Sequence, residues 1–353
     1  MSGLVFFDPA CPSPYDTRDL RARAMPGTEA SVIRIADALG AWVVQHNRAT
    51  AWERYLPVQR MAGIDQVVVI RDSRALGLAQ DLFPGARLHL WLHDKMRPAS
   101  KRGRRLRRSA PLLRAAAVSV ICVSRTHQQD VANTLRWAGV ADLPLRAIYN
   151  PLDAALQPDG TAIDAQQLVF FSSPNKGLAF ALDAFGALRR ALPDLHLVVG
   201  NPGYKSGAVP ALDGVEFLGA QPQPVIHSQV RRALCTFQPN FLIPETFGLV
   251  YAESHALGTP VLTHDFGAAA EVVGDPHQLL PVRPAYRCYE GAVGGLPPRW
   301  RARPARLAAG LGLFDAYVQR VREWQGGARP VVGPDPRFAL GTVTAQWREL
   351  LGA

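Results

Sequence analysis

The chain has 353 residues, of which 48% are hydrophobic and 19% charged, so it can bury cores and is not a disordered polymer. At about 100–200 residues per domain, this length indicates two domains. The formal net charge of +10 leaves four interpretations open: a nucleic-acid partner, an anionic membrane surface, a phosphorylated small substrate, or a plain compositional preference for arginine.

The N-terminal segment, MSGLVFFDPACPSPYD, has no basic region and no long apolar core, so we do not expect a signal peptide. No apolar stretch approaches the roughly 18–20 residues that span a bilayer. The four cysteines form no Cys-x-x-Cys pair and no zinc-spaced cluster with histidine. These features predict a reducing, cytoplasmic compartment, no metal site, and at most a peripheral contact with the inner face of a membrane.

Short apolar runs alternate with helical patterns in the first half of the chain. We expect strands at residues 4–7, 42–45, 66–70, 87–92 and 118–123, and helices at residues 29–39 and 126–138. Apolar residues fill these strands without alternation, which is typical of a sheet covered on both faces. The order of strands and helices favours a doubly wound parallel sheet.

The pattern breaks at residues 149–166, a polar stretch with Pro and Gly that we interpret as a linker. A second α/β series follows, with strands at 168–171, 195–199, 215–218, 234–238 and 261–263 and helices at 178–191, 224–232, 303–324 and 339–351. The sequence therefore predicts an acceptor-binding domain over residues 1–155, a nucleotide-sugar-binding domain over 156–335, and a C-terminal helix over 336–353 that packs back on the first domain.

The segment QPNFLIPETFGLVYAE, residues 238–253, carries the most chemical information. It follows an expected strand, runs through a loop, and opens a helix near Phe247. Gly248 leaves room for a ligand to approach the backbone, and the free N–H groups of a first helical turn bind anions. The carboxylates of Glu245 and Glu253 would repel a phosphate, but they are good acceptors for sugar hydroxyls.

The ordered string Pro-Glu-Thr-Phe-Gly, then Glu253, then Gly-Thr-Pro-Val at 258–261 and Gly-Ala-Ala-Ala-Glu at 267–271 resembles glycosyltransferase family 4. This retaining family has the GT-B fold, in which two Rossmann-like α/β domains face a central cleft. The resemblance implies that Glu245 contacts the donor sugar and Glu253 the ribose. It also assigns donor contacts to Thr246 and to the backbone of Phe247, Gly248 and Leu249.

Lys176, in the loop FSSPNKG after the first strand of the second domain, is a cation well placed for a diphosphate. The family usually has an arginine a few residues before this lysine. Here Phe171 or Ser172 stands at that place, so one diphosphate contact is either missing or supplied from elsewhere, with Ser172 or Ser173 as the candidates. A solvated surface lysine remains the structural alternative for Lys176.

In the first domain, the loop Pro-Gly-Thr-Glu at 26–29 matches the family's glycine-rich loop only at Gly27 and Glu29, and an ordinary capping loop is the alternative. His93 ends a strand and resembles the family histidine that touches the donor sugar near the reacting centre. The resemblance therefore implies a catalytic set of His93, Glu245 and Lys176.

A basic run at residues 95–108 follows the strand that leads to His93. Its eight Lys and Arg are Lys95, Arg97, Lys101, Arg102, Arg104, Arg105, Arg107 and Arg108. A solvated loop, a contact with anionic lipid headgroups, and a contact with a phosphorylated acceptor all remain open. Nucleic acid is disfavoured, because no aromatic residue interleaves the arginines as a stacking platform would require.

The expected activity is transfer of a sugar, with retention, from a nucleotide-sugar donor to the hydroxyl of a glycan or glycolipid, in a hexosyltransferase-like reaction. No Asp-x-Asp motif suggests a metal, and we expect no cofactor: the helix start near Gly248 and the cation of Lys176 would stabilise the leaving diphosphate. Bacterial polysaccharide or glycolipid synthesis is the expected setting. The alternatives are a non-catalytic protein that binds nucleotide sugars or anionic surfaces, and a sugar-nucleotide epimerase of the same fold.

Overall fold

The computed structural model describes residues 3–201, 212–239, 243–281 and 312–352. The chain forms two compact units. Unit 1 comprises residues 1–19, 27–153 and 336–353, and unit 2 comprises residues 20–26 and 154–335. Apart from residues 20–26, the chain thus passes from unit 1 to unit 2 after Asp153 and returns at Pro336.

Unit 1 is built on a seven-stranded sheet whose strands all pair in parallel, in the order β3-β2-β1-β4-β5-β6-β7. The strands are β1 (Gly3–Asp8), β2 (Trp42–Gln45), β3 (Tyr55–Pro57), β4 (Ile64–Ile70), β5 (Arg87–Leu92), β6 (Ser119–Cys122) and β7 (Leu145–Ala147). The helices of unit 1 in this part of the chain are α2 (Gly27–Leu39), α3 (Leu76–Leu82), α4 (Lys101–Arg108), α5 (Ala110–Ala115) and α6 (Arg125–Ala138). The short helix α1 (Asp19–Ala22) begins at the last residue of the first segment of unit 1 and lies mostly in residues 20–26, which belong to unit 2.

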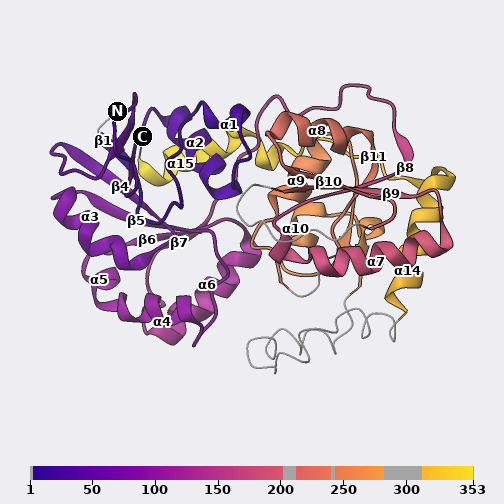
Figure 1. Cartoon of the computed structure of the whole chain (residues 1–353). Helices are drawn as coiled ribbons and strands as arrows, with labels where there is room; N and C mark the ends of the chain where they lie inside the picture. Colours follow the sequence, from indigo (N-terminus) through magenta and orange to yellow (C-terminus); the bar gives the residue numbers. More distant parts are fainter. Residues whose placement is uncertain (1–2, 202–211, 240–242, 282–311, 353) are drawn as a thin grey trace. The chain divides into compact units, whose positions relative to one another are not determined.

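Two layers of apolar side chains cover this sheet. Val5 and Phe7 of β1 point to the side on which α3, α4, α5 and α6 pack, and their core includes Leu106 of α4. Phe6 points to the other face, where α2 and the last helix, α15 (Leu340–Leu351), pack against each other (Figure 1). There the ring of Trp347 lies 5.6 Å from that of Phe6, measured between centroids. The last helix is therefore part of the core of unit 1.

Unit 2 repeats the plan with six parallel strands in the order β10-β9-β8-β11-β12-β13. They are β8 (Asp164–Phe171), β9 (His196–Asn201), β10 (Val215–Ala220), β11 (Ala233–Phe237), β12 (Val261–His264) and β13 (Leu279–Leu280). The helices are α7 (Leu178–Ala191), α8 (Gln223–Arg232), α9 (Leu249–Ala256), α10 (Ala269–Val273) and α14 (Leu313–Glu323). Short helical turns at Pro174–Lys176, Pro276–Gln278 and Trp324–Ala328 complete this unit, and the turns Ser73–Ala75 and Pro336–Phe338 belong to unit 1.

The two doubly wound α/β sheets confirm the fold class expected from the sequence. Two details of individual elements differ from the sequence analysis. The solvated loop, one of the alternatives for the basic run, does not describe residues 101–108, because these form α4, whose Arg and Leu side chains are good helix formers. The helix after Gln238 begins at Leu249 and not near Phe247, since Gly248 has φ +87° and cannot be a helical residue. No helix within the described ranges is long and apolar enough to cross a bilayer.

Candidate functional site

The strand order of unit 2 reverses between β8 and β11, and polar residues gather where these two strands end. Ligands of open α/β sheets bind at the carboxyl ends of the strands beside such a reversal. Here β8 leads into Ser172, Ser173 and the turn that carries Lys176, while β11 leads into Gln238. The strand order therefore points to the same two segments as the sequence: the loop with Lys176 after β8 and the segment that begins at Gln238 after β11.

Lys176 and Glu245 form an ion pair at this place. The Nζ atom of Lys176 donates to Oε2 of Glu245 over 2.8 Å. The side chain of Lys176 is 35% exposed, whereas that of Glu245 is 7% exposed. The second carboxylate oxygen, Oε1 of Glu245, is buried and finds no hydrogen-bond partner in the part of the chain that the structure describes. A buried acceptor without a donor is costly, so this oxygen is poised to accept a hydrogen bond from a ligand.

A backbone contact with Gly267 holds Glu245 in place. The two residues form a parallel bridge, and the N–H of Ala268 donates to the carbonyl of Glu245 over 3.0 Å. A Cβ atom at Gly267 would lie 2.7 Å from that carbonyl oxygen, and φ is +65°. Only glycine fits this position without strain. Gly267 belongs to the Gly-Ala-Ala-Ala-Glu motif of the sequence, and the structure shows that it positions the acid.

The helix that follows Glu245 begins with a strongly bent backbone. Gly248 has φ +87° and ψ +65° and forms the N-cap of α9, so the first amides of α9 have no partner within the helix. Phe247 is buried, and its side chain anchors the turn in the core. Thr246 and Leu249 are half-buried, so only small parts of their side chains are accessible.

Glu253 lies in the second turn of α9 and is 7% exposed. Its neighbour Ser254 belongs to a buried hydroxyl chain: its Oγ lies 2.6 Å from that of Thr236 on β11 and donates to the carbonyl of Thr259 over 2.7 Å. These contacts fix α9 against the sheet and so set the position of Glu253 along the helix.

Gln238 is a residue of this site to which the sequence analysis gave no role. It is fully buried at the end of β11, and its Nε2 donates to the carbonyl of Lys176 over 3.3 Å. Its Oε1, like that of Glu245, has no partner among the described residues. An amide at the end of an apolar strand was the only signal in the sequence. Gln238 joins the two loops at the strand reversal and holds the backbone from which Lys176 extends.

Ser172 and Ser173 line the same loop but are almost fully buried, with 7% and 1% exposure. The N–H of Lys176 donates to the carbonyl of Ser173 over 2.8 Å, which closes the turn. The structure therefore brings four of the expected residues into one region of unit 2, where Gln238 also lies. The four are Ser172, Ser173, Lys176 and Glu245.

Unit 1 contains the other two expected residues, Gly27 and His93. Gly27 is the first residue of α2, and its carbonyl accepts a hydrogen bond from Ser31 Oγ over 2.8 Å. His93 follows β5 directly and is buried, with its ring centroid 4.4 Å from that of Trp91. Burial, helped by the positive charge of Arg71 and by the neighbouring His127, lowers the pKa of His93 well below its usual value. The imidazole is therefore neutral at neutral pH, as a group that donates or accepts a hydrogen bond to a sugar should be.

Unit 1 also has a strand reversal, between β1 and β4, and charged residues follow those strands as well. Asp8 accepts a hydrogen bond from Tyr15 Oη over 2.9 Å. Arg71 adopts the left-handed conformation, with φ +64°, and its guanidinium pairs with Glu29 over 2.8 Å. Burial and the nearby Asp8 raise the pKa of Tyr15 well above its usual value, so Tyr15 remains a hydrogen-bond donor.

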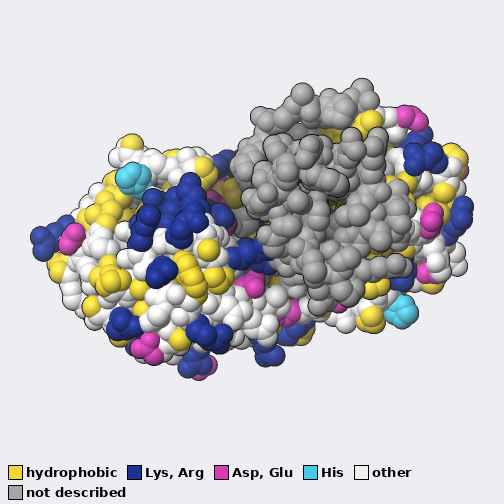
Figure 2. All heavy atoms as spheres, turned by 90° about the horizontal axis from the view of Figure 1, so that it is seen from below, with side chains coloured by type: hydrophobic (Ala, Val, Ile, Leu, Met, Phe, Trp, Pro, Cys, Tyr) yellow, Lys and Arg dark blue, Asp and Glu magenta, His cyan; other side chains and the backbone are white. Residues whose placement is uncertain are grey.

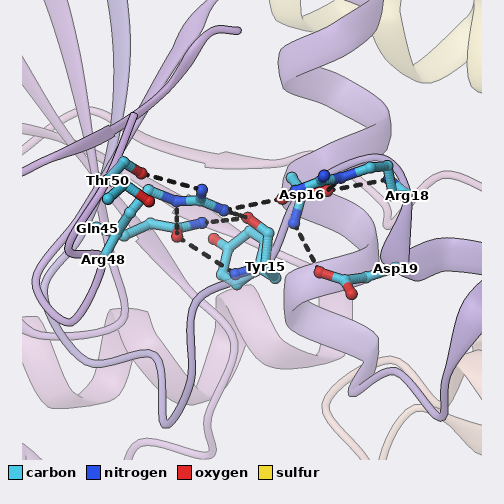
Figure 3. A network of polar contacts seen from close by, with 7 residues as sticks. All are labelled: Tyr15, Asp16, Arg18, Asp19, Gln45, Arg48 and Thr50. Atoms are coloured by element: carbon cyan, nitrogen blue, oxygen red, sulfur yellow. Dashed lines mark hydrogen bonds and ion pairs between the residues drawn. The ribbon is translucent and has the colours of Figure 1, made fainter. Parts of the chain in front are cut away.

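A further network continues from Tyr15 across the same edge (Figure 3). Gln45 exchanges hydrogen bonds with the backbone of Tyr15, and Arg48 bridges Gln45 and Asp16. Arg18 donates to both carboxylate oxygens of Asp16 at 2.9 Å, and its hydrogen bonds hold the pKa of Asp16 down at about 2. Its members are paired with one another, so this network stabilises the loops of unit 1.

The part of the chain that the structure describes contains no group of three or more His, Cys, Asp or Glu side chains arranged to hold a metal ion. The free thiols of Cys11, Cys122 and Cys235 are all buried, and burial raises their pKa. The residues at the β8–β11 reversal are thus a lysine, carboxylates, amides and hydroxyls, a set suited to anionic and hydroxyl groups of an organic ligand.

Comparison with known proteins finds proteins that act on sugars. Residues 168–282 match the family model described as "Glycosyl transferases group 1". A phosphatidyl-myo-inositol mannosyltransferase of Mycobacterium tuberculosis is 28% identical over 177 residues, which cover 46% of this chain and 46% of the relative. Its counterpart in Propionibacterium freudenreichii is 29% identical over 114 residues, 31% of this chain and 28% of the relative. The chain therefore spans less than half the length of these curated relatives.

Solved structures resemble the whole chain. The HepE protein of Anabaena, solved in complex with UDP-glucose, has a TM-score of 0.64 at 18% identity, with 100% of both chains covered. The sucrose-phosphate synthase of Thermosynechococcus elongatus has a TM-score of 0.58 at 16% identity, with 99% of this chain and 98% of that chain covered. The chain accordingly has the GT-B fold, and the portion that includes Lys176, Glu245 and Glu253 matches the group 1 glycosyl transferases.

Proposed function

We propose that the protein is a metal-independent glycosyltransferase that moves a hexose from a nucleotide-sugar donor to a hydroxyl of a glycan or glycolipid, with retention of the anomeric configuration. The observation that carries this proposal is the pair of Lys176 and Glu245 at the β8–β11 reversal, with one buried oxygen of Glu245 lacking a partner. That arrangement offers one cation for a phosphate and one acceptor for a sugar hydroxyl at the same place.

The chemistry follows from these groups. An ammonium has three donors, so Lys176 can keep its hydrogen bond to Glu245 and give another to a phosphate oxygen. The first amides of α9, after Gly248, add a partial positive charge. As the bond between the anomeric carbon and the phosphate oxygen breaks, these groups stabilise the negative charge of the leaving nucleoside diphosphate. The acceptor oxygen forms the new bond, and its proton passes to the departing phosphate.

The relatives support a sugar donor and a lipid or glycan acceptor. Two are phosphatidyl-myo-inositol mannosyltransferases, and a structural neighbour was solved with UDP-glucose. We accordingly propose as the donor a hexose linked to a nucleoside diphosphate such as UDP. The buried Glu245 and Glu253 serve the hydroxyls of the donor's sugar and ribose, while Lys176 and the turn at Ser172 and Ser173 serve the diphosphate.

A first experiment identifies the donor. The protein is heated with UDP-, GDP-, ADP- and dTDP-sugars, and the unfolding temperature is recorded. A ligand at 100 times its dissociation constant adds about 2.7 kcal/mol to the free energy of unfolding. Failure of every nucleotide sugar to raise the unfolding temperature contradicts the proposal.

Turnover then separates an enzyme from a binding protein. We expect Glu245→Gln to lower the turnover rate by on the order of a hundredfold or more. The change replaces a charged carboxylate, which is a strong hydrogen-bond acceptor, with a neutral amide. Glu216→Gln, on the exposed part of β10, is the matched control and keeps full turnover. A wild-type protein that binds the donor without transferring sugar is a binding protein. One that alters the sugar of the donor without an acceptor is an epimerase.

A further inference from the structure

The positive charge of the chain is concentrated in one stretch. Residues 95–129 contain ten Lys and Arg and no Asp or Glu. The formal net charge of the whole chain is +10, so the remaining residues carry equal numbers of acidic and basic side chains. The excess charge is therefore a local property of this stretch, and a general preference for arginine does not explain it.

Most of this charge lies on one short helix, α4 (Lys101–Arg108). Ser100 caps the helix by accepting the N–H of Gly103 over 3.0 Å, and Leu106 anchors it in the core of unit 1. Its exposed cations form what we call the basic face: Lys101, Arg102, Arg104, Arg107 and Arg108. Figure 2 views the molecule from this side and shows Lys and Arg side chains gathered over the region of α4.

The protein neutralises only part of the basic face. Arg102 pairs with Asp94 over 2.9 Å, and the guanidinium of Arg107 lies 4.9 Å from the ring centre of Trp137. For Lys101 and Arg108 the structure records no ion pair with any described residue. Unbalanced cations thus remain on an exposed helix surface.

This arrangement works against the stability of the helix. The first turn of α4 has no acidic residue and begins with Lys101 and Arg102, although positive charge at a helix N-terminus is unfavourable. Like charges three and four residues apart also repel one another. An anionic partner would relieve both effects, so the charge is suited to binding and not to folding.

We propose that the basic face binds unit 1 to the surface of an anionic lipid bilayer. Clusters of four to eight Lys and Arg on a helix suit anionic headgroups, which are numerous and make no demand on exact geometry. A single-stranded nucleic acid would be expected to stack its bases on aromatic side chains. The aromatic ring recorded beside this face, Trp137, is already covered by Arg107. The proposal concerns a surface remote in sequence from Lys176 and Glu245, and it does not depend on the proposed transfer reaction.

The test is co-sedimentation of the full chain with vesicles of phosphatidylcholine alone and of phosphatidylcholine mixed with phosphatidylglycerol. We expect binding only to the mixed vesicles, and its loss as salt is raised. The triple variant Lys101→Gln, Arg104→Gln, Arg108→Gln keeps the helix-forming tendency of α4 and removes three charges. Its partitioning should be weaker by on the order of tenfold to a hundredfold.

A matched control removes three charges elsewhere. Arg190→Gln, Arg232→Gln and Arg322→Gln change exposed residues of α7, α8 and α14 and give the same formal net charge as the α4 variant. This control should bind mixed vesicles like the wild type. Circular dichroism and unfolding temperature establish that both variants are folded.

Three outcomes overturn the proposal. In the first, the wild-type protein co-sediments no better with the mixed vesicles than with vesicles of phosphatidylcholine alone. In the second, both triple variants lose binding equally, so that total charge and not the basic face is responsible. In the third, a single-stranded or duplex oligonucleotide binds through α4 at a salt concentration that already releases the vesicles, which would make the partner a nucleic acid.

Discussion

The two units have the same sheet plan but treat their strand reversals differently. In unit 1, the charged groups at the β1–β4 reversal are paired: Arg71 with Glu29, and Asp8 with the hydroxyl of Tyr15. In unit 2, Lys176 and Glu245 form an ion pair at the β8–β11 reversal, and both Glu245 and Gln238 keep a buried oxygen without a partner among the described residues.

This difference separates groups that stabilise a fold from groups that await a ligand. A buried ion pair whose lone pairs are satisfied adds little to binding, whereas an unsatisfied buried acceptor costs stability and is retained where a ligand supplies the donor. Position in the topology therefore identifies where a site can form, and hydrogen-bond satisfaction tells which of two such positions is unfilled.

The largest expected effect is on the stability of unit 1. Arg71→Met leaves the carboxylate of Glu29, whose side chain is 3% exposed, buried without its cation. We expect the free energy of unfolding to fall by about 3–5 kcal/mol, measured by urea denaturation. The double variant Arg71→Met, Glu29→Gln removes both charges and should recover part of the loss. Equal losses in the single and double variants would mean that the pair is not responsible.

The next effect concerns unit 2 and should appear in turnover. Lys176→Met removes the cation proposed for the diphosphate, and we expect kcat to fall by about 10²–10³. Its effect on unfolding should be smaller than that of Arg71→Met, since the side chain of Lys176 is 35% exposed and water can replace it. Lys176→Arg, which keeps the charge, should retain more activity. A Lys176→Met variant that is strongly destabilised but keeps its kcat would show that the Lys176–Glu245 pair, like the Arg71–Glu29 pair, stabilises the fold.

The smallest expected effect tests the turn before α9. At Gly248, φ is +87° and an added Cβ would lie 2.4 Å from the ring of Tyr251. Gly248→Ala should lower the free energy of unfolding by about 1–3 kcal/mol, seen as a lower melting temperature. Gly186→Ala is the control: it lies inside α7 with no atom within 4 Å of the added Cβ, and should stabilise by about 1 kcal/mol. Similar shifts in the two variants would argue against a strained turn at Gly248.

Much of the fold was predictable because its main strands are continuous apolar runs. The strands β2 and β5 have the predicted bounds, since Trp42 to Gln45 and Arg87 to Leu92 are flanked by clear breaks. The short edge strands β3 and β7 were missed: their three residues are too few to show a pattern, and tertiary pairing alone makes them strands. The helix α4 was missed because its charge hides the single apolar contact, Leu106, that anchors it.

The site was predictable only where it is local in sequence. Glu245, Gly248 and Glu253 lie within nine consecutive residues, so the sequence motif alone predicted both a ligand site and the beginning of a helix there. The contact between Lys176 and Glu245 joins residues 69 positions apart and follows from the strand order, which no spacing reveals. The left-handed backbone of Arg71 and the hydrogen bond from Gln238 to Lys176 likewise depend on neighbours that only folding supplies.

The return of the chain to unit 1 at Pro336 has a consequence for dissecting this molecule. Unit 1 is discontinuous, and Trp347 of its last segment is buried beside Phe6 of the first segment and Trp91 of the second. A fragment that ends at Asp153 would therefore leave the apolar side chains of Phe6 and Trp91 uncovered on one face of the sheet, and we expect such a fragment to self-associate. Recovering an isolated N-terminal half calls for grafting residues 336–353 onto that fragment by a short peptide bridge, or for supplying them as a second polypeptide.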